Sequence, residues 1–170
     1  KNKKIFENLK KLKDQGRVGL TTGGEDKYSI IGYNFKFTNL QGALGLSQLS
    51  NLKRRIKILK ENYLLYEKNL KQNDNFRLIG FSVNKGEVPL WTDAYCNKRN
   101  ALFKYLKNKG VTCRYFWHPI NYCKPYKQSF SKFKNSKFFF KKLIWLPSSL
   151  DTSKKDILKV CKLINNFYKT

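Results

Sequence analysis

Apolar positions at the start of the chain recur at helical spacing and then lose their period. Residues 1–15 carry Ile5, Phe6, Leu9 and Leu12 on one helical face, and Gly16 follows as a C-terminal cap. Residues 17–37 show no such spacing, and we expect a loop with short extended pieces and a turn at Gly23-Gly24. The pattern therefore predicts one helix followed by an irregular segment.

The longest predicted element is a helix over residues 38–73. Thr38 and Gln41 have the spacing of a capping box, in which two side chains satisfy free backbone N–H groups at the helix start. An apolar stripe then follows at intervals of three and four residues: Leu49, Leu52, Ile56, Leu59, Tyr63, Tyr66 and Leu70. Such a stripe is typical of core packing or of a dimer seam. We expect part of it to stay exposed and to favour self-association.

From Phe76 onward the pattern is that of a small α/β domain. Strands are predicted over residues 76–81, 88–96 and 111–117, with a turn at Asn84, Lys85 and Gly86. Helices are predicted over 98–109, near 138–142, and at the end of the chain after Thr152 or Ser153. A β-α-β unit with a closing helix predicts a mixed or antiparallel sheet covered by helices.

The net charge of +25 raises the question of nucleic-acid binding. The cations are 30 Lys and only 6 Arg, whereas recognition of bases and phosphates favours the Arg fork. The Lys excess also accompanies many Asn, Ile, Phe and Tyr residues, which A/T-rich codons encode. We therefore favour a solvated basic surface and keep a nucleic-acid-binding module as an alternative.

Membrane insertion and metal binding find little support in the sequence. No apolar run approaches the roughly 20 residues that cross a bilayer, and the charged, periodic N-terminus does not resemble a signal peptide. The four cysteines lack C-x-x-C spacing, and His118 is the only histidine. We expect reduced thiols and no zinc site.

Two short segments could carry chemistry. His118 ends the run from Arg114 to Pro119, in which an Arg, aromatic rings and an imidazole could grip a phosphate or a sugar. Asn34 follows Gly32 just before the long helix, where an amide could meet an anion. Taken by itself, each segment is better explained by ordinary packing or by a plain turn. The residues alone thus indicate a basic α/β domain with one candidate anion or sugar cleft.

Four stretches, in order along the chain, resemble the DegT/StrS family of sugar aminotransferases. Residues 31–49, IGYNFKFTNLQGALGLSQL, are similar to the family signature G-[YF]-N-[YF]-R-M-T-x-[LI]-Q-A-A-[LI]-G-x-x-Q-L. The others are residues 89–94 (PLWTDA) with the helix ending at 110, residues 112–127 (TCRYFWHP, then KPYK), and residues 146–149 (LPSS) with the last helix. Together they cover essentially the whole chain.

The resemblance implies the C-terminal half of a fold-type-I aminotransferase that uses pyridoxal 5'-phosphate. Residues 1–37 would end the large cofactor-binding domain and form an active-site loop, 38–73 would be a connecting helix, and 74–170 the small C-terminal α/β domain. Such enzymes are homodimers with active sites at the subunit interface. They move an amino group from glutamate to a keto group of a nucleotide-linked deoxysugar for surface polysaccharide synthesis. The 112–119 stretch is most similar to the perosamine type, and we expect a cytoplasmic protein.

Individual residues inherit roles from this resemblance. Asn34 matches the family residue that reaches the cofactor phosphate of the partner subunit, and Tyr33 beside it is assigned to the cofactor too. Lys36 occupies the position of a usual Arg, which keeps the charge but loses the bidentate fork. The residues assigned to the sugar nucleotide are Lys36, Arg114, Phe116, Trp117, His118 and Asn121, the last standing where the family usually has His.

The lysine that holds the cofactor covalently lies, in the family, upstream of the stretch similar to residues 1–16. No catalytic residue is therefore assigned in this chain, and we expect the isolated polypeptide not to transaminate. A non-catalytic descendant of the family, with a structural or regulatory role, is the further alternative.

Overall fold

The computed structural model of the chain describes residues 2–18, 27–123 and 126–169. It divides into two compact units, Lys1–Asn51 and Leu52–Thr170. The turn expected at Gly23-Gly24 and the residues Lys124 and Pro125 lie outside the described part. The three-part division expected from the sequence has other boundaries and remains a prediction.

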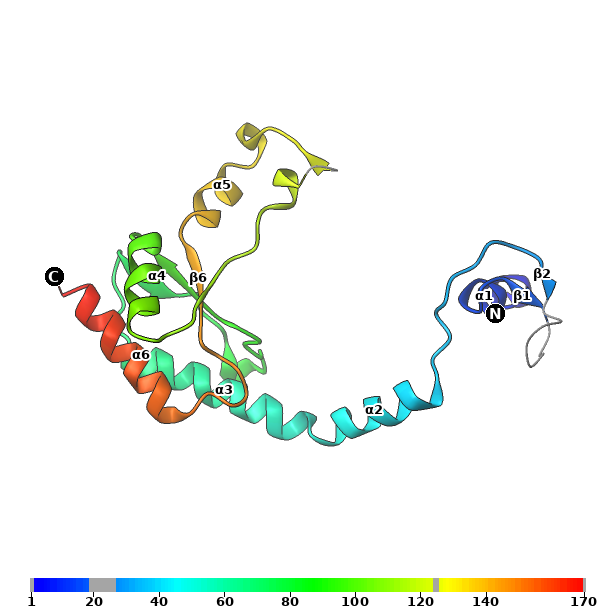
Figure 1. Ribbon diagram of the computed structural model, residues 1–170, viewed down its shortest axis with the longest axis horizontal. Helices are drawn as coiled ribbons and strands as arrows, with labels where there is room; N and C mark the ends of the chain where they lie inside the picture. Colours follow the sequence, from blue (N-terminus) through cyan, green and yellow to red (C-terminus); the bar gives the residue numbers. More distant parts are fainter. Residues whose placement is uncertain (1, 19–26, 124–125, 170) are drawn as a thin grey trace. The chain divides into compact units, whose positions relative to one another are not determined.

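The first unit is built on helix α1 (Lys3–Lys13), as the sequence predicts (Figure 1). The Asn2 side chain caps it by accepting hydrogen bonds from the backbone N–H groups of Lys4 and Ile5. Strands β1 (Arg17–Val18) and β2 (Lys27–Tyr28) then pair antiparallel. Helix α2 (Asn39–Ser50) closes the unit, and the predicted capping box between Thr38 and Gln41 is formed.

Two glycines let the segment before α2 lie against the end of α1. Gly16 has φ +84°, a left-handed conformation that favours glycine. A Cβ on Gly32 would come within 2.2 Å of the Gly16 backbone nitrogen, so the two backbones touch. This contact places Tyr33 where its N–H donates to the Leu12 carbonyl (2.7 Å) and its carbonyl accepts from Gln15 (3.0 Å).

The helix predicted over residues 38–73 is two helices, α2 and α3 (Leu52–Asn69), and the prediction of one uninterrupted helix is wrong at Asn51. The Ser50 hydroxyl and the Asn51 amide both donate to the Ser47 carbonyl. The Asn51 N–H therefore bonds to the carbonyls of Gln48 and Leu49 instead. Side chains that compete for a helix carbonyl in this way interrupt the regular ladder.

The second unit contains a four-stranded antiparallel sheet with the strand order β3-β4-β6-β5. The strands are β3 (Phe76–Leu78), β4 (Thr92–Cys96), β5 (Arg114–Tyr115) and β6 (Leu143–Leu146). Helix α4 (Arg99–Asn108) connects β4 to β5, and β6 inserts between these two strands. The result is a split β-α-β unit, which agrees with the predicted fold class.

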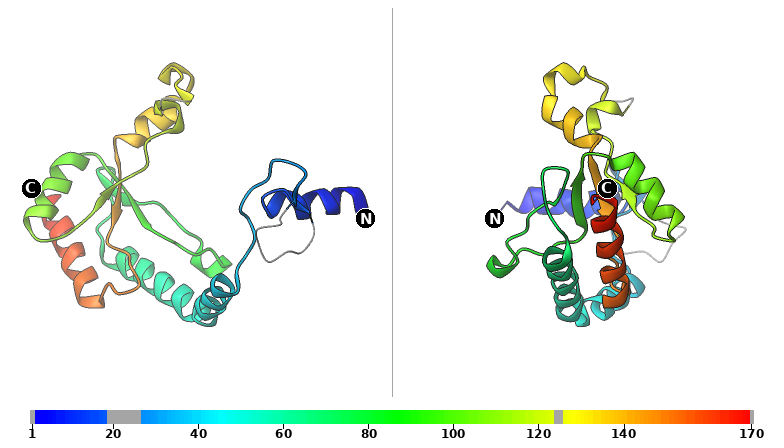
Figure 2. Two further views of the ribbon diagram at one scale, coloured as in Figure 1. Left: turned by 45° about the vertical axis from the view of Figure 1, so that its right-hand side comes forward. Right: turned by 90° about the vertical axis from the view of Figure 1, so that its left-hand side faces the viewer.

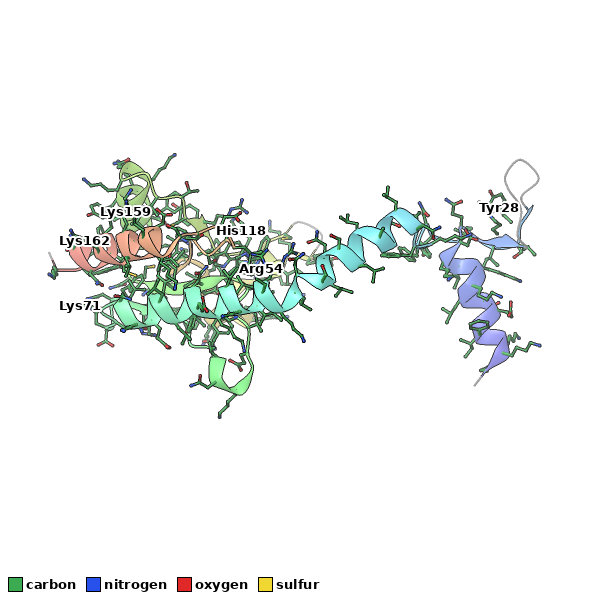
Figure 3. The ribbon with its side chains drawn as sticks, turned by 90° about the horizontal axis from the view of Figure 1, so that it is seen from below. Tyr28, Arg54, Lys71, His118, Lys159 and Lys162 are labelled. Atoms are coloured by element: carbon green, nitrogen blue, oxygen red, sulfur yellow. The ribbon has the colours of Figure 1, made fainter. Side chains whose placement is uncertain are left out.

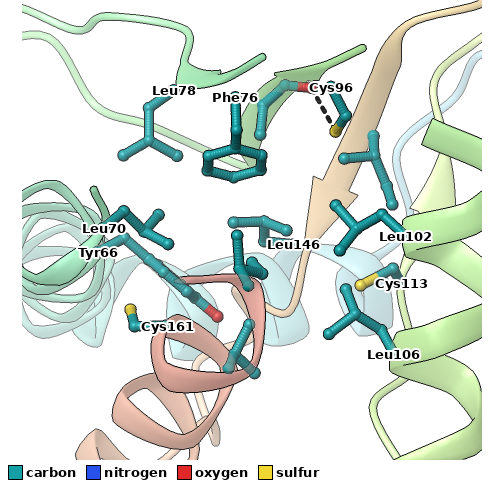
Figure 4. Close-up of a cluster of buried hydrophobic side chains, with 14 of the residues drawn as sticks. Tyr66, Leu70, Phe76, Leu78, Cys96, Leu102, Leu106, Cys113, Leu146 and Cys161 are labelled. Atoms are coloured by element: carbon teal, nitrogen blue, oxygen red, sulfur yellow. Dashed lines mark hydrogen bonds between the residues drawn. The ribbon is translucent and has the colours of Figure 1, made fainter. Parts of the chain in front are cut away.

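Helices α3, α4 and α6 (Lys154–Phe167) cover one face of this sheet and form the core. Figure 4 shows Tyr66 of α3 and Leu70 just after it, Leu102 and Leu106 of α4, and Cys161 of α6 gathered near Leu146 of β6. The buried Tyr66 hydroxyl donates a hydrogen bond to the Pro147 carbonyl at 2.8 Å, so it is not left unpaired in the core. Of the predicted stripe, Tyr63, Tyr66 and Leu70 are thus core. Ile56 and Leu59 are partly buried, and Leu49 and Leu52 stay exposed.

Short 3-10 turns and one more helix complete the unit. The turns are Val83–Lys85, Ile120–Tyr122 and Phe130–Lys132, and the predicted turn ends at Gly86 with φ +98°. Helix α5 (Lys134–Phe140) leads directly into β6 and projects beyond the end of the sheet away from α3 (Figures 1 and 2). It begins four residues earlier than the sequence predicts.

The strands differ most from the sequence prediction. Strands β3, β4 and β5 are shorter than the predicted segments 76–81, 88–96 and 111–117. Strand β6 is absent from the prediction because all four of its residues are buried, so no alternation of polar and apolar positions marks it. The last helix begins after the cap Ser153, one of the two caps expected.

Candidate functional site

The sheet face opposite the three helices carries a row of functional side chains. The register places Asp93 of β4 and Arg114 of β5 on either side of Trp145 of β6, as direct cross-strand partners. Side chains of directly paired residues project from the same face of a sheet. A carboxylate and a guanidinium therefore flank one indole ring on this face.

All three tryptophans of the chain meet around this indole. Trp91 stacks on Trp145 with a centroid distance of 5.0 Å and an interplanar angle of 7°. Trp117 contacts Trp145 edge to face at 5.0 Å, and Phe116 does so at 5.9 Å. These aromatic residues, Trp91, Phe116, Trp117 and Trp145, are called the aromatic cluster below. Offset and edge-to-face pairs hold such rings in fixed positions.

A cavity of about 480 Å³ opens beside the aromatic cluster. Its lining includes Phe116, Trp117 and His118, which the sequence assigns to the substrate, and Asp93, which it does not. Phe139 and Phe140 of α5 and Ile79 and Leu143 supply most of the remaining apolar wall. The size and the mixture of aromatic walls with a few polar groups are typical of small-molecule sites.

Asp93 is the least expected residue of this cavity. Burial raises the pKa of its carboxyl to about 6, and the nearby indole of Trp145 acts in the opposite direction. Asp93 Oδ1 is nevertheless buried without a hydrogen bond of good geometry to any described residue, as is Trp145 Nε1. An acidic residue between Thr92 and Ala94 in a buried strand was the sequence signal for it.

Arg114 lines a different cavity from Phe116, Trp117 and His118. This second cavity, of about 370 Å³, lies on the other side of Trp145 and includes Trp91 together with Ser148 and Ser149. The Arg114 side chain is exposed, and no described carboxylate pairs with it. An unpaired guanidinium beside two hydroxyl-bearing residues suits an anion such as a phosphate.

Asn121 stabilises the loop that carries His118. Asn121 is 5% exposed, and its side-chain amide donates to the Gln128 backbone carbonyl at 3.4 Å. The Asn121 backbone carbonyl accepts from the Gln128 backbone N–H at 3.1 Å. Asn121 is not among the lining residues of either cavity. Its assignment to the substrate stays a prediction, and the structure brings it to the loop interior instead.

The residues assigned to the cofactor lie in the first unit. Tyr33 and Phe35 stack at 5.3 Å with an interplanar angle of 12°, and Phe35 N–H donates to the Lys13 carbonyl. Asn34 bridges backbone to backbone with Asp14, while its side chain is exposed and bonds to no other described residue. Lys36 Nζ lies 3.1 Å from Asp14 Oδ2. The backbone is thus fixed while the Asn34 amide is left available.

The basic charge is spread over the surface of the second unit as well. Figure 3 labels Lys71, Lys159 and Lys162 near the same ends of α3 and α6, and a groove there is lined by Lys71, Lys162 and Lys169. Within the described residues no three His, Cys, Asp or Glu side chains are grouped to hold a metal ion. Burial raises the thiol pKa of Cys96, Cys113 and Cys161 to about 12, and Cys123 is exposed.

The chain is similar to known proteins over nearly its whole length. The family model of the DegT/DnrJ/EryC1/StrS aminotransferase family matches residues 1–165. The chain is 24% identical over 173 residues to a GDP-perosamine synthase of Escherichia coli O157:H7, covering 98% of this chain and 45% of that protein. It is also 24% identical over 163 residues to a UDP-4-amino-4,6-dideoxy-N-acetyl-beta-L-altrosamine transaminase of Campylobacter jejuni, covering 91% and 43%. The chain therefore spans a little under half the length of these relatives.

Solved structures share the fold. Helicobacter pylori PseC, an aminotransferase of pseudoaminic acid biosynthesis, superposes with a TM-score of 0.78 at 19% identity, over 99% of this chain and 47% of its own. The putative sugar aminotransferase Spr1654 of Streptococcus pneumoniae, in its PMP form, gives 0.82 at 14% identity, over 99% and 46%. No helix among the described residues has the length and apolar character needed to cross a membrane.

Proposed function

Because this chain belongs to the DegT/DnrJ/EryC1/StrS aminotransferase family, we propose that it is part of a sugar aminotransferase that depends on pyridoxal 5'-phosphate. The reaction transfers an amino group from glutamate to the keto group of a nucleotide-linked deoxysugar, in the cytoplasm, for surface glycan synthesis. Support comes from the relatives, which include a GDP-perosamine synthase and a UDP-amino-sugar transaminase. The observation that carries the proposal is a family match that contains both the Asn34 segment and the aromatic cluster.

The sugar nucleotide binds to the face of the second unit that carries the aromatic cluster. Arg114 supplies a charge for the diphosphate, because its guanidinium has no described carboxylate partner. Phe116 and Trp117 offer apolar ring faces to the sugar, and His118 adds a hydrogen-bonding group at the same cavity. Each side chain thus has a partner in a phosphorylated sugar, which is what a specific site requires.

The exposed amide of Asn34 fits the phosphate of the cofactor. An amide with no internal hydrogen bond can donate to an anion, and the bonds from Tyr33 and Phe35 to α1 keep its backbone in place. We assign this contact across a homodimer, to the cofactor of the partner subunit, with Tyr33 beside it. When bound, the cofactor supplies the electron sink that amino-group transfer needs. We assign no lysine of this chain to its covalent attachment.

The test is amino transfer by the natural protein that contains this chain. Glutamate is supplied with GDP-, UDP- and dTDP-linked 4-keto-6-deoxyhexoses, and mass spectrometry detects the amino sugar and 2-oxoglutarate. We expect product from at least one of these substrates. Folded protein that retains the cofactor and forms product from none of them would contradict the proposal and favour a non-catalytic family member.

The same assay tests Asn34. Asn34→Ala removes one hydrogen bond to a charged group, so we expect cofactor binding to weaken about tenfold, measured by the absorbance retained after dialysis. Asn84→Ala is the matched control, because Asn84 is exposed in a turn of the other unit. Equal retention by both variants would remove Asn34 from the cofactor site.

A further inference from the structure

Asp93 is the one acid in a mostly apolar and aromatic cavity, whose other polar lining residues are His118, Asn135 and Ser136. Among the lining residues of this cavity it is the one carboxylate, and the lining contains no lysine or arginine. The cross-strand partner of Asp93 is Trp145, whose indole lowers the pKa of Asp93 less than burial raises it. The acid is therefore not part of an internal ion pair that would explain its position.

This arrangement destabilises the free protein. Oδ1 of Asp93 is buried and makes no hydrogen bond of good geometry to a described residue, and a buried polar atom left unpaired is unfavourable. The residue lies in the middle of β4, directly opposite Trp145 of β6. A group kept at such a position is best explained by a ligand that completes its hydrogen bonding.

We propose that Asp93 determines which sugar the protein accepts, by accepting a hydrogen bond from a hydroxyl of the sugar ring. The apolar face of the same ring packs against Phe116 and Trp117, which line the cavity with Asp93. This inference rests on the proposed function and adds a specificity-determining residue to it. Carboxylates and aromatic planes complement the two kinds of surface that a sugar presents, its hydroxyls and its C–H faces.

The charges around the cavity select among ligands. A phosphate would be repelled by the carboxylate, and a cation would have to approach a chain with a net charge of +25. A neutral hydroxylated ring meets neither obstacle. Arg114 lies two strands away from Asp93, with Trp145 on the strand between them. At the usual strand spacing, the backbones at Arg114 and Asp93 are about 10 Å apart. A hexose joined to a diphosphate can place the phosphates at Arg114 and the ring at Asp93.

The experiment compares pairs of ligands that differ only in the sugar. Isothermal titration measures binding of the 170-residue chain to GDP-mannose against GDP, and to UDP-N-acetylglucosamine against UDP. We expect Asp93→Ala to weaken binding of the sugar-bearing ligand at least tenfold and to change binding of the bare diphosphate less than twofold. Asp74→Ala, which removes an exposed acid in a turn, should change neither.

Asp93→Asn provides a second variant that keeps the shape of the side chain. It removes the charge that burial disfavours, so it should fold even where alanine leaves a gap, and we expect a loss of three- to tenfold for the sugar-bearing ligand. If the wild type binds the sugar-bearing ligand and neither variant weakens that binding, the role of Asp93 is overturned while the proposed function stands. Equal weakening of both ligands would do the same. Absence of binding by the wild-type chain to every ligand would contradict the proposed function and this inference with it.

Discussion

At the scale of single residues, Asp93 makes the stability of the folded protein depend on pH. Its carboxyl has a pKa of about 6 in the folded chain against an ordinary value of 3.8, because burial disfavours the charged form. The folded protein therefore binds a proton more tightly than the unfolded chain between these two values. The contribution of Asp93 to the free energy of unfolding falls as the pH rises from about 4 to about 6 and is constant above that range.

Asp93→Asn should remove this dependence. We expect the variant to be more stable than the wild type above pH 6, by about 1–2 kcal/mol after allowance for partial solvent exposure. The difference should shrink toward zero near pH 4, where both chains are neutral at this position. Urea unfolding between pH 4 and pH 8 measures it. His118 lines the same cavity in both proteins, so the comparison isolates the effect of residue 93.

A difference that stays constant with pH would contradict the assigned burial of the Asp93 charge. So would a difference that grows toward acid. Asp74→Asn is the control, because it makes the same substitution at an exposed acid in a turn.

At the scale of elements, sequence patterns located the helices better than the strands. The capping box at Thr38 and the apolar faces of α1, α4 and α6 follow from spacing that a helix alone imposes. Strand β6 could not be found this way, because four consecutive buried residues carry no period. The break at Asn51 depends on hydrogen bonds from the Ser50 and Asn51 side chains to the Ser47 carbonyl. A hydrophobic pattern does not indicate such bonds.

The contact between Gly16 and Gly32 gives a direct test of how the Asn34 segment is held. In Gly32→Ala the new Cβ would lie 2.2 Å from a backbone nitrogen, so the two segments must separate. We expect a destabilisation on the order of 2 kcal/mol for the local opening. Amide hydrogen exchange of Tyr33 and Gln15 reports it, because these N–H groups make the bonds that join the segment to α1.

Gly42→Ala is the matched control in the same unit. Nothing lies within 4 Å of a Cβ at Gly42, which is inside α2, so alanine should stabilise the helix by up to about 1 kcal/mol. Unchanged protection of Tyr33 and Gln15 in Gly32→Ala would contradict the backbone contact.

At the scale of the whole molecule, the residues assigned to the cofactor and those assigned to the sugar nucleotide lie in different units. The resemblance of residues 31–49 to a family signature predicts the cofactor and assigns Asn34 to it from sequence alone. The same comparison assigned Arg114 and His118 together to the sugar nucleotide, yet they line cavities on opposite sides of Trp145. Asp93 and Trp145 were missed because cross-strand register, which makes them neighbours, depends on β6. Local spacing could not supply that register.

Tryptophan fluorescence measures the central claim, that the aromatic cluster binds a nucleotide-linked sugar. Trp91, Trp117 and Trp145 are the only tryptophans of the chain, and all three belong to the cluster. Titration with GDP-mannose or UDP-N-acetylglucosamine should produce a saturable change in emission that Trp117→Phe reduces. An emission that stays constant to millimolar ligand would contradict the claim. So would a change that an RNA oligonucleotide reproduces and that vanishes as salt rises, since this is the behaviour of a general basic surface.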